Sequence, residues 1–430
     1  MSAATTLPAV GGAPLGGYEL LCELASGGMA TVYVARPGPG VPGAAAGHAL
    51  VALKCLHPHL WRKPGFVEMF LDEARLSAQI RHPSVVSALD VGGDREEGYF
   101  LAMPYVEGAD LGTLQRSARS RGQRMTPPVV VRIVLDTLAG LQAAHGLRDR
   151  QGLPLGLVHR DVSPHNLMIG VDGITRLTDF GVAKARGRLA ETEAGMIKGK
   201  LSYMAPEQAS GKEVDHRSDL FAMGIVLWEA LARQRLFYRE DPSDCFRRLL
   251  FAPIPRLGDL ESRLTPFDAV IAKALAREPG QRFGSAAEFA RALERAAVRA
   301  GGVADRASVA RVVEALAAEK LSHERDVLRH YDLGGAPERA PAAASGGPLS
   351  PASMHSGSRL RPYTAPPMAP DSHDPCERST TRRRRRPKLP KQRRLSRLAL
   401  LAILATAGAL WAASQSPGSE AAPSAEAAPE

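Results

Sequence analysis

Cysteine is scarce in this chain. Its 430 residues include four cysteines, far apart and in no paired spacing: Cys22, Cys55, Cys245 and Cys376. This spacing excludes a zinc ribbon and a disulfide framework, and it indicates a reducing compartment. Aromatic residues make up only 5%, yet 44% of all residues are hydrophobic, which is enough for a sizeable core and excludes disorder throughout the chain.

A general excess of positive charge is also missing. Lysine and arginine number 55 against 45 aspartate and glutamate, a net charge of +10. Residues 382–397 alone hold ten basic residues and no acidic one, so the rest of the chain is neutral, with 45 of each sign. The high isoelectric point therefore reflects one segment and says nothing about the main domain.

Uncharged apolar runs long enough to span a membrane are absent until the end of the chain. Residues 1–17 contain none, so we expect no signal peptide there and a disordered N-terminal segment. Residues 398–413 are uncharged and as a helix would span ~24 Å, slightly less than the ~30 Å hydrocarbon core. Because Ser414–Ser416 can extend it into the interface, we predict a transmembrane helix over 398–416.

The basic segment 382–397 predicts how this helix is oriented. Cations directly before a span fix that side as cytoplasmic, so we expect a single-pass protein of the cell membrane with its main domain in the cytoplasm. The basic residues would contact anionic lipids, and residues 417–430 would form a short polar extracytoplasmic tail. The alternatives are nucleic-acid binding by the five consecutive arginines, and an apolar helix that is buried in a core or docks on a partner protein.

Residues 18–300 have a globular pattern. Short β-like runs come first, at 30–35, 50–56 and 99–103, and helical patterns follow, at 129–144, 218–232 and 286–300. This order predicts an α+β fold in two lobes, a β-rich N-lobe over 18–105 and a helical C-lobe over 106–300. Residues 301–333 are expected to add one or two helices of unclear role, and residues 334–381 to form a disordered linker rich in Pro, Ala and Ser.

Three features inside this region could carry chemistry. A run of small residues at 24–32 forms a glycine-containing turn whose N–H groups could approach phosphate oxygens, although such hairpins are common. Lys54 lies in an apolar strand, and helical spacing over 66–80 places Glu73 on one face with aromatic residues. A buried carboxylate is costly without a partner, so Lys54 is its expected counter-ion. The alternative is a lysine on an edge strand that reaches solvent.

The sharpest pattern joins two motifs by a turn. His-Arg-Asp-Val-Ser-Pro-His-Asn at 159–166 and Thr-Asp-Phe-Gly at 178–181 flank the turn pair Asp172-Gly173. In a hairpin centred on the turn residues 172 and 173, the numbers of paired residues have the same sum as the two turn residues, 345. Positions 166 and 179 also sum to 345 and are therefore predicted to pair. Asn166 and Asp179 would thus offer two hard oxygen ligands side by side, which suits Mg²⁺.

In this order the motifs resemble those of bacterial eukaryotic-like (Hanks-type) serine/threonine protein kinases, over residues 18–297. The resemblance implies the bilobal protein kinase fold. It also implies transfer of the ATP γ-phosphate to serine or threonine hydroxyls of protein substrates, with Mg²⁺ as the metal cofactor, autophosphorylation and a role in membrane-proximal signalling. We expect no nucleic-acid partner, and a homodimer for autophosphorylation stays open.

The resemblance assigns roles to particular residues. Asp161 would be the catalytic base for the substrate hydroxyl, and Asn166 and Asp179 would hold Mg²⁺. Lys54 would contact the α- and β-phosphates, and Glu73 would orient it. Nucleotide-binding roles fall on Ala52, on Met103 as gatekeeper, on Pro104 and Val106 of the hinge, and on the loop residues Leu24, Ala25, Ser26, Gly27, Gly28, Met29, Ala30, Thr31 and Val32.

The chain departs from the family pattern at five positions, one of which is Pro104 in place of the common hinge glutamate. Ala25 and Ala30 replace loop glycines, which predicts a stiffer loop with weaker nucleotide affinity. Ser163 stands where the family has a catalytic-loop lysine, and Lys200 where it has an activation-segment threonine. Since these two side chains meet near the γ-phosphate in the family, we hypothesise that cation and hydroxyl have exchanged places. The alternatives are two independent losses in an impaired enzyme, a pseudokinase scaffold, or a kinase for small molecules.

The resemblance also predicts regulation and support. Thr192 is the only hydroxyl residue between Asp179 and Ser202 and is our candidate autophosphorylation site, unless its glutamate neighbours already supply the charge. Arg160 would pair with the phosphate. Further expected contacts are an ion pair between Glu207 and Arg282, and bracing of the catalytic loop by Asp219.

Overall fold

The structure is a computed structural model that describes residues 13–61, 65–94, 96–180 and 201–333, all in one unit of the chain. The predicted linker, basic segment, transmembrane helix and tail, over 334–430, lie outside the described residues. So do Lys200 and Thr192.

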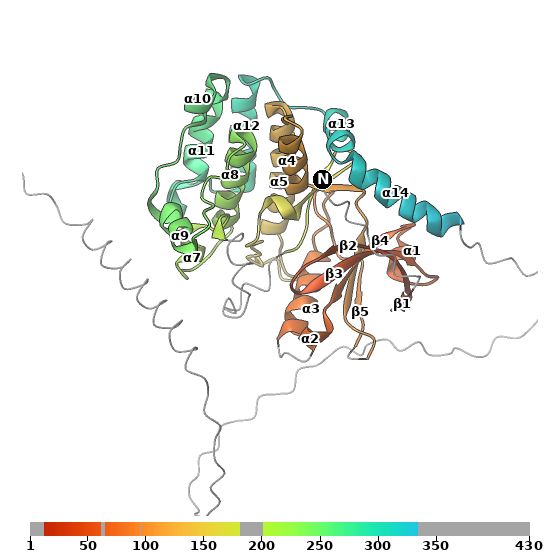
Figure 1. Cartoon of the computed structure of the whole chain (residues 1–430). Coiled ribbons are helices and arrows are strands. Elements are labelled where there is room, and N and C mark those ends of the chain that lie inside the picture. Colours follow the sequence, from red (N-terminus) through yellow and green to blue (C-terminus); the bar gives the residue numbers. More distant parts are fainter. Residues whose placement is uncertain (1–12, 62–64, 95, 181–200, 334–430) are drawn as a thin grey trace, which may run out of the picture. The chain divides into compact units, whose positions relative to one another are not determined.

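The first part of the chain forms an antiparallel six-stranded sheet in the order β1-β2-β3-β4-β6-β5 (Figure 1). Its strands are β1 (Pro14–Leu15), β2 (Tyr18–Ser26), β3 (Ala30–Pro37), β4 (Val51–Leu56), β5 (Asp90–Gly92) and β6 (Phe100–Pro104). Between them lie α1 (Pro42–Ala45), α2 (Pro58–Trp61) and α3 (Phe66–Ser77). The three β-like runs read from the sequence are confirmed as β3, β4 and β6.

The second part is mainly helical, with a small antiparallel sheet in the order β7-β8-β9. The strands are β7 (Gly108–Asp110), β8 (Leu167–Gly170) and β9 (Thr175–Leu177). The helices are α4 (Leu111–Ser120), α5 (Pro127–His145), α7 (Pro206–Ala209), α8 (Arg217–Ala232), α9 (Pro242–Phe251), α10 (Leu257–Leu260), α11 (Asp268–Ala274), α12 (Ala286–Val298), α13 (Arg306–Leu316) and α14 (Ala318–Leu333). The expected helices at 129–144, 218–232 and 286–300 are confirmed as α5, α8 and α12.

Helices α5 and α8 form the centre of the helical lobe. Both carry apolar residues all around their axes, as buried helices do, and their side chains belong to one core that also includes residues of α12 and α13. Among the described residues, α5 is the helix that is long and apolar enough to cross a membrane. Because 67% of its apolar stretch is buried inside the protein, α5 serves here as a core helix.

A buried ion pair joins α7 to the segment before α12, as the sequence predicts. The two guanidinium nitrogens of Arg282 each donate to one carboxylate oxygen of Glu207 at 2.7 Å, and both side chains are almost fully buried. The Ser218 hydroxyl donates to the same carboxylate at 2.5 Å. Burial alone would raise the pKa of Glu207, but Arg282 and Ser218 hold it below its usual value. The start of α7 is thereby fixed.

Helix α14 crosses from the helical lobe onto the N-terminal sheet, where it contacts β2 (Figure 1). Val327, Leu328 and Tyr331 pack against a small core formed by β2 and β3. The Tyr105 hydroxyl, in the segment that joins the lobes, donates to Glu324 at 3.2 Å. Lys320 donates to Glu324 at 2.5 Å and to the Gly108 carbonyl oxygen at 2.8 Å. Helix α14 therefore braces the outer side of the hinge.

This brace predicts a stability effect with an internal control. Lys320→Met should lower the free energy of unfolding by about 2 kcal/mol, because it leaves the buried Glu324 carboxylate without its cation. Adding Glu324→Met should recover most of the loss, since a buried ion pair can be replaced by apolar groups of similar size. Urea unfolding of the full chain measures both effects.

Arg329→Met on the same helix is the matched control. Arg329 pairs with Asp326 at 2.8 Å, but both side chains are more than half exposed. Its loss should cost less than about 0.5 kcal/mol. A double variant less stable than Lys320→Met alone would contradict the proposed brace.

Candidate functional site

The centre of the site is a lysine held between two carboxylates from distant parts of the chain. Lys54 on β4 donates to Glu73 on α3 at 2.9 Å and to Asp179, just after β9, at 2.7 Å. The Lys54 and Glu73 side chains are 15% and 11% exposed, whereas Asp179 is 45% exposed. The ion pair expected between Lys54 and Glu73 is confirmed, and Asp179 joins it from the other lobe.

Burial and neighbouring charges together set the protonation of Lys54 and Glu73 in this cluster. Burial alone would lower the pKa of Lys54, but the fields of Asp179 and Glu73 outweigh it, so the pKa lies above its usual value and the lysine is a cation. Burial raises the pKa of Glu73, Lys54 lowers it, and the neighbouring Asp179 and Asp161 raise it again. A nucleotide phosphate or a divalent cation entering here would meet an ordered set of charges.

The loop that carries Asp161 is held by the buried Asp219 of α8. Its two carboxylate oxygens accept the backbone N–H groups of His159 and Arg160, each at 2.8 Å, and a ring nitrogen of His145 at 2.8 Å. Arg160 has a φ of +65°, a left-handed conformation that a side chain disfavours. The carboxylate compensates for this strain, which confirms the bracing expected of Asp219.

His159 lies fully buried under the same loop and connects it to β9. Its Nδ1 accepts the Asp161 N–H at 3.2 Å, and its Nε2 lies 2.9 Å from the Thr178 carbonyl oxygen. A carbonyl oxygen can only accept, so Nε2 carries the proton and the ring is neutral. Burial lowers the pKa of His159, which agrees with this assignment. The sequence contains His159, but its role as a link was not predicted.

The hairpin between the two motifs exists, but its predicted register is wrong by one residue. Leu167 pairs with Leu177 and Ile169 with Thr175, so paired numbers sum to 344. The turn has three residues, 171–173, and its last residue, Gly173, has a φ of +73°. A side chain at Gly173 would also lie 2.0 Å from the Arg306 carbonyl oxygen of α13. The extra residue shifts every pairing.

Asn166 consequently pairs with Thr178 rather than with Asp179. The Asn166 carbonyl oxygen accepts the Thr178 N–H at 3.0 Å, and its side-chain Nδ2 donates to the Asp161 carbonyl oxygen at 2.8 Å. That contact fixes the amide, so the side-chain oxygen faces away from the Asp161 carbonyl. Asp179 follows directly, with a φ of +55° and an accessible carboxylate.

These donors fit Mg²⁺. Among the described residues no group of three or more His, Cys, Asp or Glu is placed to hold a metal. One carboxylate and one amide oxygen at the open end of a hairpin are few protein ligands, and Mg²⁺ in nucleotide sites takes its remaining ligands from phosphate oxygens and water. Asn166 and Asp179 would hold the ion.

The candidate nucleotide-binding residues lie on or next to β2, β3, β4 and β6, the four inner strands of the N-terminal sheet. Residues Leu24–Val32 span the β2–β3 hairpin, in which Ala25 pairs with Val32 and Gly27 donates to the Ala30 carbonyl oxygen at 2.9 Å. Ala52 pairs with Met103 across β4 and β6. Within the described part of the chain, the Val106 N–H donates no hydrogen bond, so it is available to an adenine ring.

Two residues that the sequence did not single out complete the support. The Gln208 side chain of α7 donates to the Arg160 carbonyl oxygen at 3.0 Å and accepts the Ala205 N–H at 3.2 Å. Glu324 reaches the hinge through Tyr105. Gln208 directly follows Glu207, whose ion pair with Arg282 the sequence predicts, so its position could have pointed to a supporting role. Nothing in the local pattern of α14 points to the hinge. Ser163 lies half-buried between Asp161 and Asn166.

The neutral His159 predicts a pH dependence of stability. Its pKa in the folded protein lies below the usual 6.5, so the unfolded chain binds more protons as the pH falls below that value. Stability should therefore drop as the pH falls from about 6.5, by up to about 1.4 kcal/mol per pH unit from this residue. His159→Asn and His159→Gln should flatten the slope of the unfolding free energy against pH. An unchanged slope in both variants would contradict this role.

Known proteins resemble the chain in sequence and in fold. Residues 18–291 match the protein kinase domain family. Over 282 residues the chain is 42% identical to the tyrosine-protein kinase MasK of Myxococcus xanthus. The matched region covers 65% of this chain and 43% of MasK. It is 35% identical to the serine/threonine-protein kinase PknB of Mycobacterium leprae, over 63% of this chain and 42% of PknB.

The fold comparison agrees. The crystal structure of the Mycobacterium tuberculosis PknI kinase domain matches with a TM-score of 0.52 and 28% identity, over 67% of this chain and 98% of that domain. The chain spans less than half the length of the two curated relatives. With its sheet lobe, its helical lobe and the motif residues gathered between them, the chain belongs to the protein kinase family and carries a Hanks-type kinase domain that has bacterial serine/threonine kinases among its homologues.

Proposed function

We propose that the chain is an active serine/threonine protein kinase, anchored in the cell membrane, that transfers the γ-phosphate of ATP to protein hydroxyls. One observation carries the proposal: Lys54 contacts both Glu73 and Asp179 while Asp161 and Asn166 are held on the adjoining loop. Phosphoryl transfer in this family depends on a lysine placed by a glutamate and on an aspartate that holds Mg²⁺, and Lys54, Glu73 and Asp179 match these three residues.

Each of these residues has a definite task in the proposal. Asp161, fixed through its N–H by His159 and through its carbonyl oxygen by Asn166, would accept the proton of the substrate hydroxyl. Lys54 would hold the α- and β-phosphates, since its charge is retained by two carboxylates. Mg²⁺ held by Asn166 and Asp179 would neutralise the developing phosphate charge.

The choice between serine/threonine and tyrosine acceptors is the finer part of the proposal. PknB is named a serine/threonine kinase, which supports our choice. MasK is named a tyrosine kinase, and its identity to this chain is higher, so a tyrosine acceptor is the specific alternative. The two are separated by identifying the phosphorylated amino acid.

The exchange of Ser163 and Lys200 bears on whether the enzyme is active. We propose that Lys200 supplies the cation that Ser163 cannot. We also propose that Thr192 is the autophosphorylation site. If one copy of the chain phosphorylates another, the reaction would take place in a homodimer. Ser163 lies on the loop between Asp161 and Asn166. A pseudokinase is the alternative, and Ser163 is the residue that favours it.

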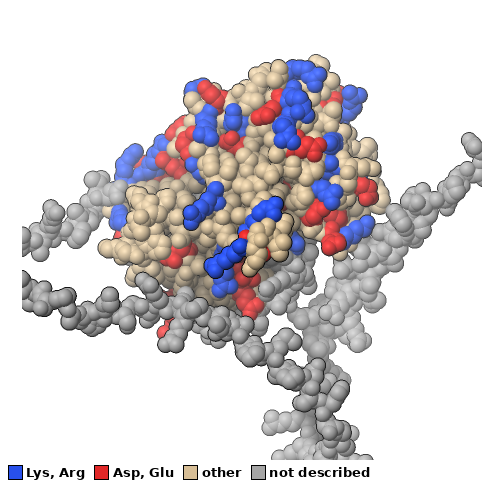
Figure 2. Space-filling view, turned by 180° about the vertical axis from the view of Figure 1, so that it is seen from behind, with Lys and Arg blue, Asp and Glu red and all other residues tan. Residues whose placement is uncertain are grey.

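Membrane anchoring rests on the sequence alone. The uncharged run at 398–413 follows the ten basic residues of 382–397, which supports a span whose kinase domain is cytoplasmic. Figure 2 shows acidic and basic side chains interspersed on one face of the described part of the protein.

Radiolabel transfer from Mg-ATP to the chain itself and to a protein substrate tests the function. Asp161→Asn should lose at least about 100-fold in rate, because the base is removed. Lys200→Met should lose about 100-fold as well, and Lys200→Thr combined with Ser163→Lys should restore most of the activity. Acid hydrolysis of the product should yield phosphoserine or phosphothreonine.

Three results would count against parts of this proposal. Equal labelling by wild type and Asp161→Asn would exclude catalysis by this site. Undiminished turnover of Lys200→Met would exclude the exchange with Ser163. Recovery of phosphotyrosine alone would show that the acceptor is tyrosine, as the name of MasK states for that protein, and not serine or threonine.

A further inference from the structure

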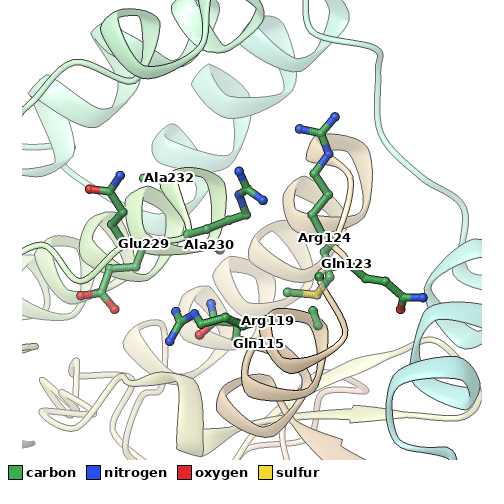
Figure 3. A pocket seen from close by; sticks show the side chains of 12 residues that line it. Gln115, Arg119, Gln123, Arg124, Glu229, Ala230 and Ala232 are labelled. Atoms are coloured by element: carbon green, nitrogen blue, oxygen red, sulfur yellow. The ribbon is translucent and has the colours of Figure 1, made fainter.

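A hollow lies between α4 and the C-terminal end of α8, on the helical lobe (Figure 3). It encloses about 300 Å³, and Gln115 and Arg119 of α4 face Glu229 and Ala230 of α8 across it. A smaller hollow of about 150 Å³ shares Gln115, Arg119 and Glu229 with it. Since the smaller hollow is also lined by Pro164 and His165, the two form a groove that begins beside the loop carrying Asp161.

Arginine side chains dominate the walls of this groove: Arg116, Arg119, Arg124, Arg233 and Arg235. Arg124 is partly neutralised by Glu261 at 3.6 Å. Arg119 and Arg233 are both exposed, and within the described residues neither has a carboxylate partner. The groove therefore presents a surplus of positive charge to solvent.

Among the described residues, one acidic side chain lines the groove, and its charge is already neutralised. Glu229 is 4% exposed. One of its oxygens accepts the Tyr203 hydroxyl at 2.7 Å and Arg235 at 3.0 Å, and the other accepts the Leu236 N–H at 2.9 Å. Its charge is used inside the protein, so it cannot attract a basic ligand.

A second observation points to a ligand that accepts hydrogen bonds. The Nε2 of Gln115 is buried and has no hydrogen-bond acceptor in the described part of the chain. Gln115 lines both hollows. A buried amide donor without a partner is costly, and a turn of the Gln115 side chain toward the groove would let a carboxylate held by Arg119 accept from it.

We propose that this groove binds acidic side chains of the protein substrate and so selects acceptors flanked by glutamate or aspartate. The inference rests on the proposed kinase function, since it places the groove beside the loop of the catalytic base. The chain's own sequence contains such a segment, because Thr192 is flanked by Glu191 and Glu193. Exposed arginines and a desolvated amide would recognise these carboxylates.

Peptides of residues 188–198 (RLAETEAGMIK) test the proposal. The native peptide is compared with one in which Glu191 and Glu193 are both lysine, and kcat/KM for phosphorylation is measured with the full chain. The native peptide should be preferred by at least about fivefold, the expected gain from two exposed charge contacts. Arg119→Glu combined with Arg233→Glu should abolish or reverse the preference.

Controls separate this proposal from the kinase proposal itself. Anisotropy of the fluorescein-labelled peptides measures binding to the full-length Asp161→Asn chain without any transfer, and the same preference is expected. Arg295→Glu, on the exposed face of α12 and lining neither hollow, should leave the preference intact. If the variant with Arg119→Glu and Arg233→Glu fails to fold, the variant with Arg119→Gln and Arg233→Gln replaces it in the same measurement. Equal binding of both peptides, or a preference that survives loss of the two arginines, would overturn the proposal.

Discussion

The contact of Lys54 with two carboxylates is the interaction on which the site depends. Glu73 comes from α3 of the sheet lobe, whereas Asp179 follows β9 of the helical lobe. A buried lysine stays charged only beside compensating charge, so the cluster ties α3 and β4 of the sheet lobe to the segment after β9 of the helical lobe. Substrate positioning in this family is a matter of such preorganised charge, because the protein does little covalent chemistry.

The loop of Asp161 is held by a different kind of constraint, a set of buried hydrogen bonds around a strained backbone. Asp219 accepts two backbone N–H groups across the left-handed Arg160, and neutral His159 ties the same loop to Thr178. Strain of this kind persists only where the surroundings determine it. The lysine cluster and this loop are therefore stabilised in the same way. Each contains buried polar groups that would destabilise the fold if they had no partner, and each group is paired with a neighbour.

Much of this could be predicted from the sequence, and the failures have physical causes. Lys54 and Glu73 could be paired because helical spacing buries a carboxylate and only one lysine stands in an apolar strand. The predicted register of the hairpin between β8 and β9 was wrong because the turn contains Val171 as well as Asp172 and Gly173. The residue types of Asp172 and Gly173 indicate a turn but do not show that a third residue belongs to it. The contact of Glu324 with the hinge was missed because it links positions 219 residues apart.

A double-mutant cycle on the lysine cluster tests the central claim most directly. The value of kcat/KM for ATP is measured for wild type, Lys54→Met, Glu73→Gln and the double variant. If Glu73 acts by placing Lys54, the two losses should overlap, with a coupling of about 2 kcal/mol, and the double variant should be little worse than Lys54→Met alone. Losses that simply add would show that the two residues act independently and would contradict the account.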